Sequence, residues 1–239
     1  MNNYNTLQFE KDIKAMNISL SDKQIEQFLI YYEMLIEKNK VMNLTAITDF
    51  DEVIEKHFID SLSLVKVMDL NKDISVIDLG TGAGFPGIPL KITFPNLKIV
   101  LADSLNKRVL FLNDVIRELG LEKIEAIHGR AEDLARNPLY REQFDLVVSR
   151  AVANLSTLSE YCLPFTNVGG YFVSYKSGEV DDELETAKKA ISILGGRPSE
   201  VEKFVLGDSK RSFVCVEKVK NTPNKFPRKA GTPKNEPIS

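Results

Sequence analysis

Residues 75–90 contain a glycine-rich loop that constrains the fold more than any other part of the chain. The run Ser-Val-Ile-Asp-Leu is typical of a buried strand, and it leads directly into Gly80, Gly82 and Gly84. Glycines at these alternate positions let a ligand or a helix approach the backbone closely. Pro86 follows and suits the first turn of a helix. A strand, a glycine loop and a helix in this order are how α/β folds build a site for a nucleotide-like ligand.

Beyond residue 74, short apolar runs alternate with helical patterns. We expect strands at 75–79, 97–102, 123–128, 144–149, 169–175, 201–206 and 212–217, and helices at 86–94, 105–119, 154–163 and 181–194. Short uninterrupted apolar strands are typical of a parallel sheet with both faces buried. The last two strands are joined by 207–211, which is too short for a helical crossover, so we expect them to pair antiparallel. The chain therefore predicts a doubly wound α/β sheet, mostly parallel with an antiparallel edge strand.

The first seventy residues have helical patterns. Ser21 and Gln24 form a capping-box signature in front of a one-sided apolar stripe, and a second helical stretch runs from about Asp51 to Met68. We therefore predict a small N-terminal helical cap over residues 1–70. A Rossmann-like core should follow over 71–218, and a basic tail over 219–239.

Composition excludes several classes of protein. The 239 residues are 43% hydrophobic and 27% charged, which is ordinary for a globular domain with a small appendage. We find no apolar run long enough to span a membrane and no signal-peptide pattern, so we expect a cytoplasmic protein without a membrane partner. Cys162 and Cys215 match no metal or redox spacing. We expect both to be buried free thiols, and we expect no bound metal.

A net charge of −3 hides a basic C-terminal segment. Residues 218–234 contain six Lys and Arg residues and no acidic residue. Such a patch attracts phosphate groups even on an acidic protein, although basic ends are also common as plain solvated surface. Its prolines should keep the segment extended, and Phe226 places an aromatic ring among the cations. Stacking combined with phosphate contacts suits unpaired RNA, but charge alone does not identify the partner.

The residues around the glycines narrow the choice of ligand. A dinucleotide fingerprint is G-x-G-x-x-G, whereas here the third glycine comes one residue early and Phe85 takes its place. A pyrophosphate favours a free helix N-terminus, whereas S-adenosylmethionine has no phosphate and tolerates Phe85 and Pro86 in that space. Asp103 ends the second expected strand, where its carboxylate can accept hydrogen bonds from the ribose hydroxyls of either ligand. These features favour S-adenosylmethionine over NAD.

Several separate segments carry a more specific pattern. They are Asn-Leu-Thr-Ala-Ile at 43–47, Lys-His-Phe-x-Asp-Ser-Leu at 56–62, Asp-x-Gly-x-Gly-x-Gly-Phe-Pro-Gly at 78–87, Asp-Ser-x-x-Lys-Arg at 103–108, Arg-Ala-Glu at 130–132, Ser-Arg-Ala-Val at 149–152 and Phe-Pro-Arg-Lys-Ala-Gly-Thr-Pro at 226–233. Together they resemble the RsmG (GidB) family, bacterial class I methyltransferases that form 7-methylguanosine in the 530 loop of 16S ribosomal RNA. One departure is Phe226, where the family often has Tyr.

The resemblance implies a class I S-adenosylmethionine-dependent methyltransferase acting on N7 of a guanine in 16S rRNA, guanine 527 in standard rRNA numbering, within the small ribosomal subunit. By position it implies cofactor contacts at Gly80, Phe85, Ala131, Glu132 and Arg150. With the rest of the glycine loop and the ribose carboxylate, the full set of expected cofactor residues is Asp78, Gly80, Gly82, Gly84, Phe85, Asp103, Ala131, Glu132 and Arg150. Nothing in the sequence indicates an obligate protein partner, so we expect a monomer.

The absence of motifs used in other kinds of methyl transfer is consistent with methylation at guanine N7. The fourth expected strand is not followed by the Asn/Asp-Pro-Pro-aromatic motif common in enzymes that methylate exocyclic amines. Guanine N7 has a free lone pair and no proton to remove, so positioning and desolvation can carry most of the barrier. We therefore expect no acid–base catalyst. Arg150 and Lys176 are candidates for positioning the substrate through phosphate or guanine O6, and His57 is expected to be a packed histidine.

The basic tail is the expected RNA contact. We expect Lys225, Arg228 and Lys229 to grip ribosomal RNA beside the active site. Two other interpretations stay open: a small-molecule methyltransferase with the same cofactor, and a non-catalytic regulator that binds RNA or the cofactor. The open basic tail argues against the first, and the intact glycine loop argues against the second.

Overall fold

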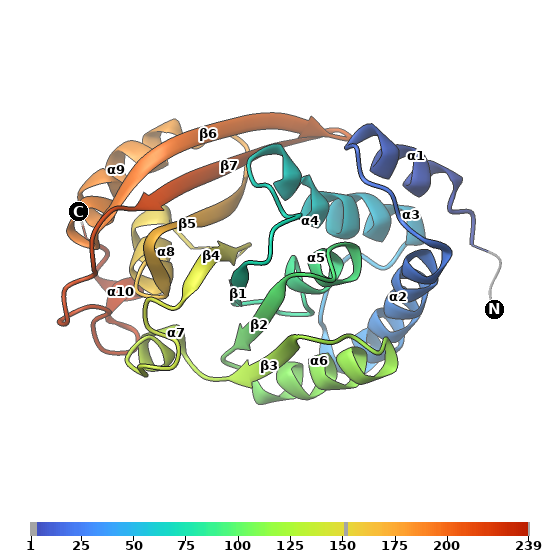
Figure 1. Ribbon diagram of the computed structural model, residues 1–239, viewed down its shortest axis with the longest axis horizontal. Helices are drawn as coiled ribbons and strands as arrows, with labels where there is room; N and C mark the ends of the chain where they lie inside the picture. The colour runs from blue at the N-terminus through green and yellow to red at the C-terminus, as the bar shows by residue number, and fades with distance from the viewer. Residues whose placement is uncertain (1–3, 151–152, 239) are drawn as a thin grey trace.

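A seven-stranded sheet forms the centre of the molecule (Figure 1). The computed structural model describes residues 4–150 and 153–238. The strands are β1 (Ser75–Leu79), β2 (Lys98–Asp103), β3 (Ile124–His128), β4 (Phe144–Ser149), β5 (Thr166–Ser177), β6 (Gly196–Leu206) and β7 (Ser209–Lys218). They lie in the order β3-β2-β1-β4-β5-β7-β6, with β1 to β5 parallel and β7 antiparallel to both of its neighbours. The predicted class of fold is confirmed.

The final hairpin is antiparallel, as its short connection predicted. β7 lies inside the sheet between β5 and β6, so β6 is the strand at the edge. β6 begins at Gly196, five residues before the expected start, because residues 196–200 pair with β7 although they carry little apolar pattern. Pairing with a long neighbour extends a strand beyond what its own composition indicates.

Helices cover both faces of the sheet (Figure 1). Those of the core are α5 (Gly87–Thr93), α6 (Asn106–Glu118), α7 (Ala131–Leu134), α8 (Leu155–Cys162), α9 (Asp181–Ile193) and α10 (Thr232–Asn235). Successive residues of β1 point to opposite faces, so Val76 packs in the cluster with α5 and α6, and Ile77 in the cluster with α8 and α9. None of the helices in the described part of the chain is both long and apolar enough to cross a membrane.

The N-terminal helices share the core of the α5 and α6 face. They are α1 (Leu7–Ala15) and α2 (Asp22–Met42), followed by a broken helix of α3 (Phe50–Val53), η1 (Ile54–Ile59), α4 (Asp60–Leu62) and η2 (Ser63–Lys66). The capping box at Ser21 and Gln24 is present at the start of α2. Phe28, Tyr31 and Phe58 are fully buried against the core, so these helices are part of one packed body.

The helix expected from 51 to 68 is interrupted because its middle, η1, is a π-helix. A π turn adds a residue to the helical repeat, and such turns are frequent at functional sites. Here the turn sets His57 and Asp60 toward the end of β4. An apolar periodicity counted on 3.6 residues per turn does not reveal this irregularity.

The C-terminal segment, residues 219–238, packs back onto the core beside α7 and α8 (Figure 1). Phe226 is only 7% exposed, and Arg141 donates to the carbonyl oxygens of Thr222 and Phe226 at 2.8 and 3.0 Å. Lys218 is fully buried and donates to the carbonyl oxygens of Leu163 and Thr166. The segment is therefore held by the core along its length.

Candidate functional site

The glycine loop leaves β1 in a left-handed backbone conformation. Gly80, Gly82 and Gly84 have φ values of +72°, +63° and +108°, which only glycine adopts easily. A side chain on Gly84 would place its Cβ 2.6 Å from Ile88 and 2.9 Å from the hydroxyl of Tyr31. The glycines predicted a close approach to the loop backbone, and at Gly84 it is made by the side chains of Ile88 and Tyr31.

Asp78 ties the loop to the helix that follows it. Its Oδ2 accepts hydrogen bonds from the Thr81 hydroxyl at 2.7 Å and from the Gly87 amide at 2.9 Å. The side chain is fully buried, and this desolvation raises the pKa of Asp78 to about 6. Asp78 thus fixes the shape of the loop by joining Thr81 to Gly87, the first residue of α5.

A cavity of about 370 Å³ opens at the carboxyl ends of β1, β2 and β4, where open parallel sheets bind ligands. We call it the glycine-loop cavity. Four expected cofactor residues line it, namely Gly80, Asp103, Ala131 and Glu132. Sequence reasoning missed the remainder of the wall, which is Leu79, Ala102, Ser104, Gly129, Arg130, Ser149, Ala153, Leu158, Tyr161, Cys162, Gly231 and Lys234.

Two carboxylates of the glycine-loop cavity are fixed by backbone amides. Asp103 accepts from the amides of Gly82 at 2.9 Å and Leu105 at 2.8 Å, so its position at the end of β2 is set before a ligand arrives. Glu132 accepts from the amide of Gly231 at 2.9 Å. Its side chain therefore fastens the C-terminal segment to the cavity wall.

A second cavity, of about 550 Å³, lies between the N-terminal helices, the ends of β4 and β5, and the β6–β7 hairpin. We call it the Arg150 cavity. Ala153 lines both cavities, so the two adjoin. The other residues that line the Arg150 cavity are Ile47, Lys56, His57, Asp60, Arg150, Asn154, Tyr175, Lys176, Ser177, Glu183, Phe204, Arg211, Ser212 and Phe213. Cations, carboxylates and aromatic rings thus meet in one hollow next to the glycine-loop cavity.

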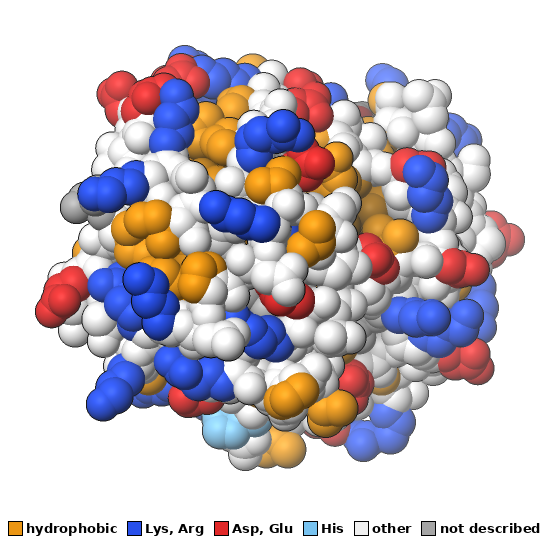
Figure 2. All heavy atoms as spheres, turned by 60° about the vertical axis from the view of Figure 1, so that its left-hand side comes forward, with side chains coloured by type: hydrophobic (Ala, Val, Ile, Leu, Met, Phe, Trp, Pro, Cys, Tyr) orange, Lys and Arg blue, Asp and Glu red, His pale blue; other side chains and the backbone are white. Residues whose placement is uncertain are grey.

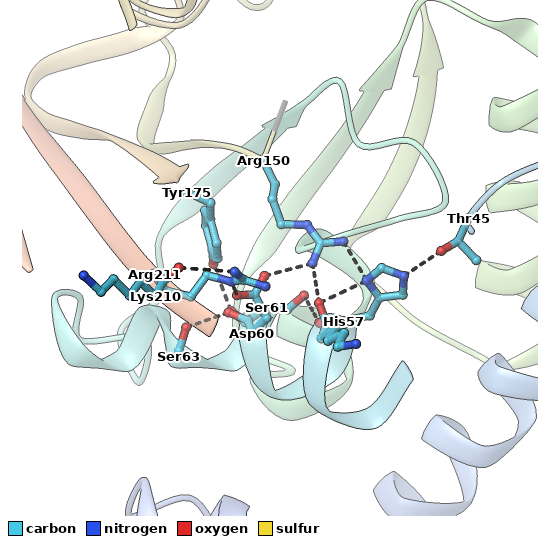
Figure 3. A network of polar contacts seen from close by, with 10 residues as sticks. Thr45, His57, Asp60, Ser61, Ser63, Arg150, Tyr175, Lys210 and Arg211 are labelled. Carbon is cyan, nitrogen blue, oxygen red and sulfur yellow. Dashed lines mark hydrogen bonds and ion pairs between the residues drawn. The ribbon is translucent and has the colours of Figure 1, made fainter. Parts of the chain in front are cut away.

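Arg150 is the centre of a polar network (Figure 3). Its guanidinium donates to Asp60 Oδ2 at 2.9 Å and to the carbonyl oxygen of Lys56 at 3.1 Å, and it lies 5.1 Å from the ring centroid of Phe85. Asp60 is 4% exposed and also accepts from Arg211 Nε at 2.9 Å. One buried carboxylate therefore pairs with two arginines, Arg150 directly after β4 and Arg211 in β7.

His57 is packed within this network. Its ring stacks on Phe85 with centroids 4.5 Å apart, and its Nε2 lies 2.8 Å from the Thr45 hydroxyl. Burial, and then the charge of Arg150, lower the pKa of His57 to about 3. The ring is therefore neutral, and its Nδ1 lies 3.2 Å from Arg150 Nη2 and 3.1 Å from the carbonyl oxygen of Lys56. His57 is a packed histidine, as expected.

Lys176 lies at the end of β5 and faces the Arg150 cavity. Its ammonium donates to the carbonyl oxygen of Ala153 and to Glu183 Oε1, both at 2.7 Å. Glu183 also accepts from the amide of Leu155 at 2.7 Å. Lys176, which we expected to position the substrate, is therefore part of an ion pair that joins β5, α8 and α9.

The tail residues divide into two kinds. Lys225 and Lys229 are exposed, and the Lys225 ammonium lies 5.2 Å from the ring centroid of Phe226. Arg228 instead forms a two-pronged ion pair with Glu160, whose side chain is 1% exposed. The guanidinium of Arg228 is thus already paired with a carboxylate of the protein.

In the ion pairs around Arg150 and Lys176, the residues that sequence reasoning did not single out are Asp60, Glu183 and Arg211. Glu183 follows two aspartates at the start of α9, where acidic residues are expected for helix stability alone. Arg211 belongs to a hairpin far from the glycine loop in the sequence. The pairing of a carboxylate with cations from distant strands has no local sequence signal.

Comparisons with known proteins show which family and which folds this chain is similar to. The family described as rRNA small subunit methyltransferase G matches residues 24–214. The ribosomal RNA small subunit methyltransferase G of Lachnoclostridium phytofermentans is 52% identical over 232 residues, which cover 96% of each chain. The structure of a SAM dependent methyltransferase from Aquifex aeolicus has a TM-score of 0.55 at 19% identity and covers 73% of this chain and 96% of that one. M. jannaschii TYW2 in complex with AdoMet has a TM-score of 0.53 at 15% identity, covering 62% of this chain and 71% of that one. The likeness to these two structures concerns the fold.

Proposed function

Because the chain belongs to the family of rRNA small subunit methyltransferase G, we propose that it transfers a methyl group from S-adenosylmethionine to 16S ribosomal RNA. The acceptor in this proposal is N7 of guanine 527 in the 530 loop. The rRNA target comes from the names of the relatives, and the nucleotide comes from the resemblance of the sequence motifs. The observation that carries the proposal is the pair of cavities that adjoin at Ala153.

The glycine-loop cavity has the groups that S-adenosylmethionine requires. Asp103, held by two amides, is placed to accept hydrogen bonds from the ribose hydroxyls. The small side chain of Ala131 and the apolar side chain of Leu158 suit a flat adenine ring, and Gly80 exposes loop backbone to the methionine part. Asp78, Gly82 and Gly84 support these contacts by fixing the loop.

The Arg150 cavity is the proposed seat of the guanine. When bound, S-adenosylmethionine supplies an electrophilic methyl group, and N7 offers a lone pair without a proton to remove. The protein then has to place the base and exclude water. Arg150 and Lys176 contribute positive charge there, and Phe85 orients Arg150 through its ring face. His57 is neutral and buried, so its part is to hold Arg150 rather than to move a proton.

The proposed RNA surface lies on the face that carries the C-terminal segment. Figure 2 shows Lys and Arg side chains among hydrophobic ones on this face. Exposed Lys225 and Lys229 offer phosphate contacts there, while Gly231 and Lys234 of the same segment line the glycine-loop cavity. The segment therefore links the RNA surface to the cofactor wall, and Arg228 anchors it through Glu160.

The test is incubation of the protein with methyl-labelled S-adenosylmethionine and either small ribosomal subunits or protein-free 16S rRNA, both from cells that lack this modification. We expect label in 16S rRNA, mapped to a single 7-methylguanosine in the 530 loop. Label in small metabolites only would contradict an RNA substrate. Label at another position of the rRNA would contradict the proposed nucleotide while leaving rRNA as the substrate.

A further inference from the structure

One ion pair in the Arg150 cavity stands apart from the Arg150 network. Lys176 Nζ lies 2.7 Å from Glu183 Oε1, and the two side chains are 11% and 31% exposed. Both described partners of Glu183, Lys176 and the amide of Leu155, bind Oε1, which leaves Oε2 available to a ligand. Lys176 uses two of its three ammonium protons on Ala153 and Glu183. The pair is thus held rigidly and still offers a donor beside an acceptor.

This order of groups is complementary to one edge of guanine. The edge presents the acceptor O6 next to the donors N1–H and N2–H, so a cation beside a carboxylate satisfies it. We infer that Glu183 determines the specificity for guanine by accepting hydrogen bonds from N1–H and N2–H while Lys176 binds O6. The inference rests on the proposed function and names how the acceptor base is chosen.

The pair also sets which side of the base faces the methyl donor. Lys176 is hydrogen-bonded to Ala153, the residue that lines both cavities, so the O6 end of the base lies nearer the glycine-loop cavity. N7 is next to O6 in guanine and therefore turns toward that cavity. Adenine has its donor and acceptor in the opposite order, so binding it to the same pair would turn its N7 away.

Glu183 should also affect the rate of methyl transfer, because positive charge moves onto the purine during the reaction. As the bond from N7 to the methyl carbon forms, the bond from sulfur to that carbon breaks and its electron pair stays on sulfur. No proton leaves N7, so the positive charge moves from the sulfonium to the purine. A carboxylate on the N1–H and N2–H groups binds this cationic purine more strongly than the neutral base. Glu183 therefore favours the transition state and offsets the charge of Lys176.

The experiment pairs Glu183→Gln with a change in the base. The substrates are 16S rRNAs ligated from synthetic segments that carry guanine or inosine at position 527, inosine being guanine without its N2 amine. We expect the wild type to prefer guanine by about 10-fold in kcat/KM, and E183Q to prefer it by about 2-fold or less. The lower intrinsic reactivity of inosine is the same for both enzymes and cancels in this comparison. Glu185→Gln, on the exposed face of the same helix, is the matched control and should keep the wild-type preference.

The outcomes separate this inference from the proposed function. E183Q keeps an oxygen for Leu155 and Lys176, so we expect normal folding and S-adenosylmethionine affinity. If it does not fold, Glu183→Asp keeps the charge but withdraws it from the base and should also reduce the preference. An unchanged preference in a folded Glu183 variant, with normal transfer to N7 by the wild type, would overturn the inference alone. Absence of N7 transfer by the wild type would overturn the proposed function and this inference together.

Discussion

Asp60 is a single buried carboxylate that neutralises two arginines, Arg150 and Arg211. Removing one partner of a buried ion pair leaves charge without compensation, which typically costs ~3–5 kcal/mol. We expect Asp60→Asn to lower the free energy of unfolding in urea by about that amount. Asp69→Asn is the control, because Asp69 is exposed and its pair with Lys72 spans 3.5 Å; its effect should stay within about 0.5 kcal/mol. Equal stability of the two variants would contradict the assigned role of Asp60.

His57 gives the stability of the fold a defined dependence on pH. In the folded protein its pKa is about 3, whereas an unfolded chain has a histidine pKa of about 6.5. Below pH 6.5 the unfolded state takes up a proton that the folded state refuses, so stability present above pH 6.5 is lost as the pH falls toward 3. The loss is about 1.4 kcal/mol per pH unit.

The measurement is urea unfolding of the wild type and of His57→Gln at pH 7.5, 6 and 5. From pH 7.5 to 5 the free energy of unfolding should fall by about 2 kcal/mol more in the wild type than in the variant. This figure follows because pH 5 lies about 1.5 units below the histidine pKa of the unfolded chain. Asp78, with its pKa raised to about 6, titrates in the same range with the opposite sign, but it is present in both proteins and cancels. Parallel pH profiles would show that His57 can take up a proton in the folded protein.

Among the elements, strands and helices were predictable wherever a local pattern decided them. α9 begins at Asp181, and the buried thiols of Cys162 and Cys215 lie where their apolar runs placed them. The π turn at η1 was not predictable because an apolar periodicity of 3.6 residues does not reveal it, and the early start of β6 was not because it depends on pairing with β7. Gly80 could be expected in the cavity wall because it directly follows a predicted strand, whereas Asp60 and Glu183 reach the Arg150 cavity only through the tertiary fold.

One of the contacts that hold the C-terminal segment is a clamp between Glu160 and Arg228. Glu160 of α8 accepts from the Arg228 amide at 2.7 Å and from its guanidinium Nη2 at 2.7 Å. We expect Glu160→Gln to weaken this clamp, because the guanidinium loses its buried counter-charge. Amide hydrogen exchange over residues 219–238 should then accelerate by roughly 10- to 100-fold, and trypsin should cleave there sooner.

Glu185→Gln is the control for the clamp, since Glu185 is exposed and its ion pair among the described residues is with Lys188 of its own helix. The affinity for S-adenosylmethionine should fall in E160Q as well, because Gly231 and Lys234 belong to the cavity wall. Unchanged exchange in the segment would mean that its other contacts, such as the Gly231 amide to Glu132, hold it without the clamp.

On the scale of the whole molecule, the two cavities adjoin at Ala153, and the C-terminal segment borders the glycine-loop cavity. The sheet brings the carboxyl ends of β1, β2 and β4 together for the glycine-loop cavity, and the N-terminal helices close the Arg150 cavity from the other side. Gly231 and Lys234 of the C-terminal segment line the glycine-loop cavity, and Lys225 and Lys229 of the same segment are exposed. A protein with a net charge of −3 can in this way attract a phosphate backbone locally.

The salt dependence of RNA binding tests that arrangement. The double variant Lys225→Gln and Lys229→Gln removes two exposed cations and leaves the Arg228 clamp intact. Each phosphate contact to single-stranded RNA contributes about 0.7 to the slope of log K against log salt, so the slope should fall by about 1.4 while affinity for S-adenosylmethionine is kept. Lys11→Gln with Lys14→Gln removes two exposed cations from α1, on the opposite side of the molecule from the tail (Figure 1), and should leave the slope as it is. If both double variants keep the wild-type slope, the RNA surface does not include the tail, and its cations act only as solvated charge.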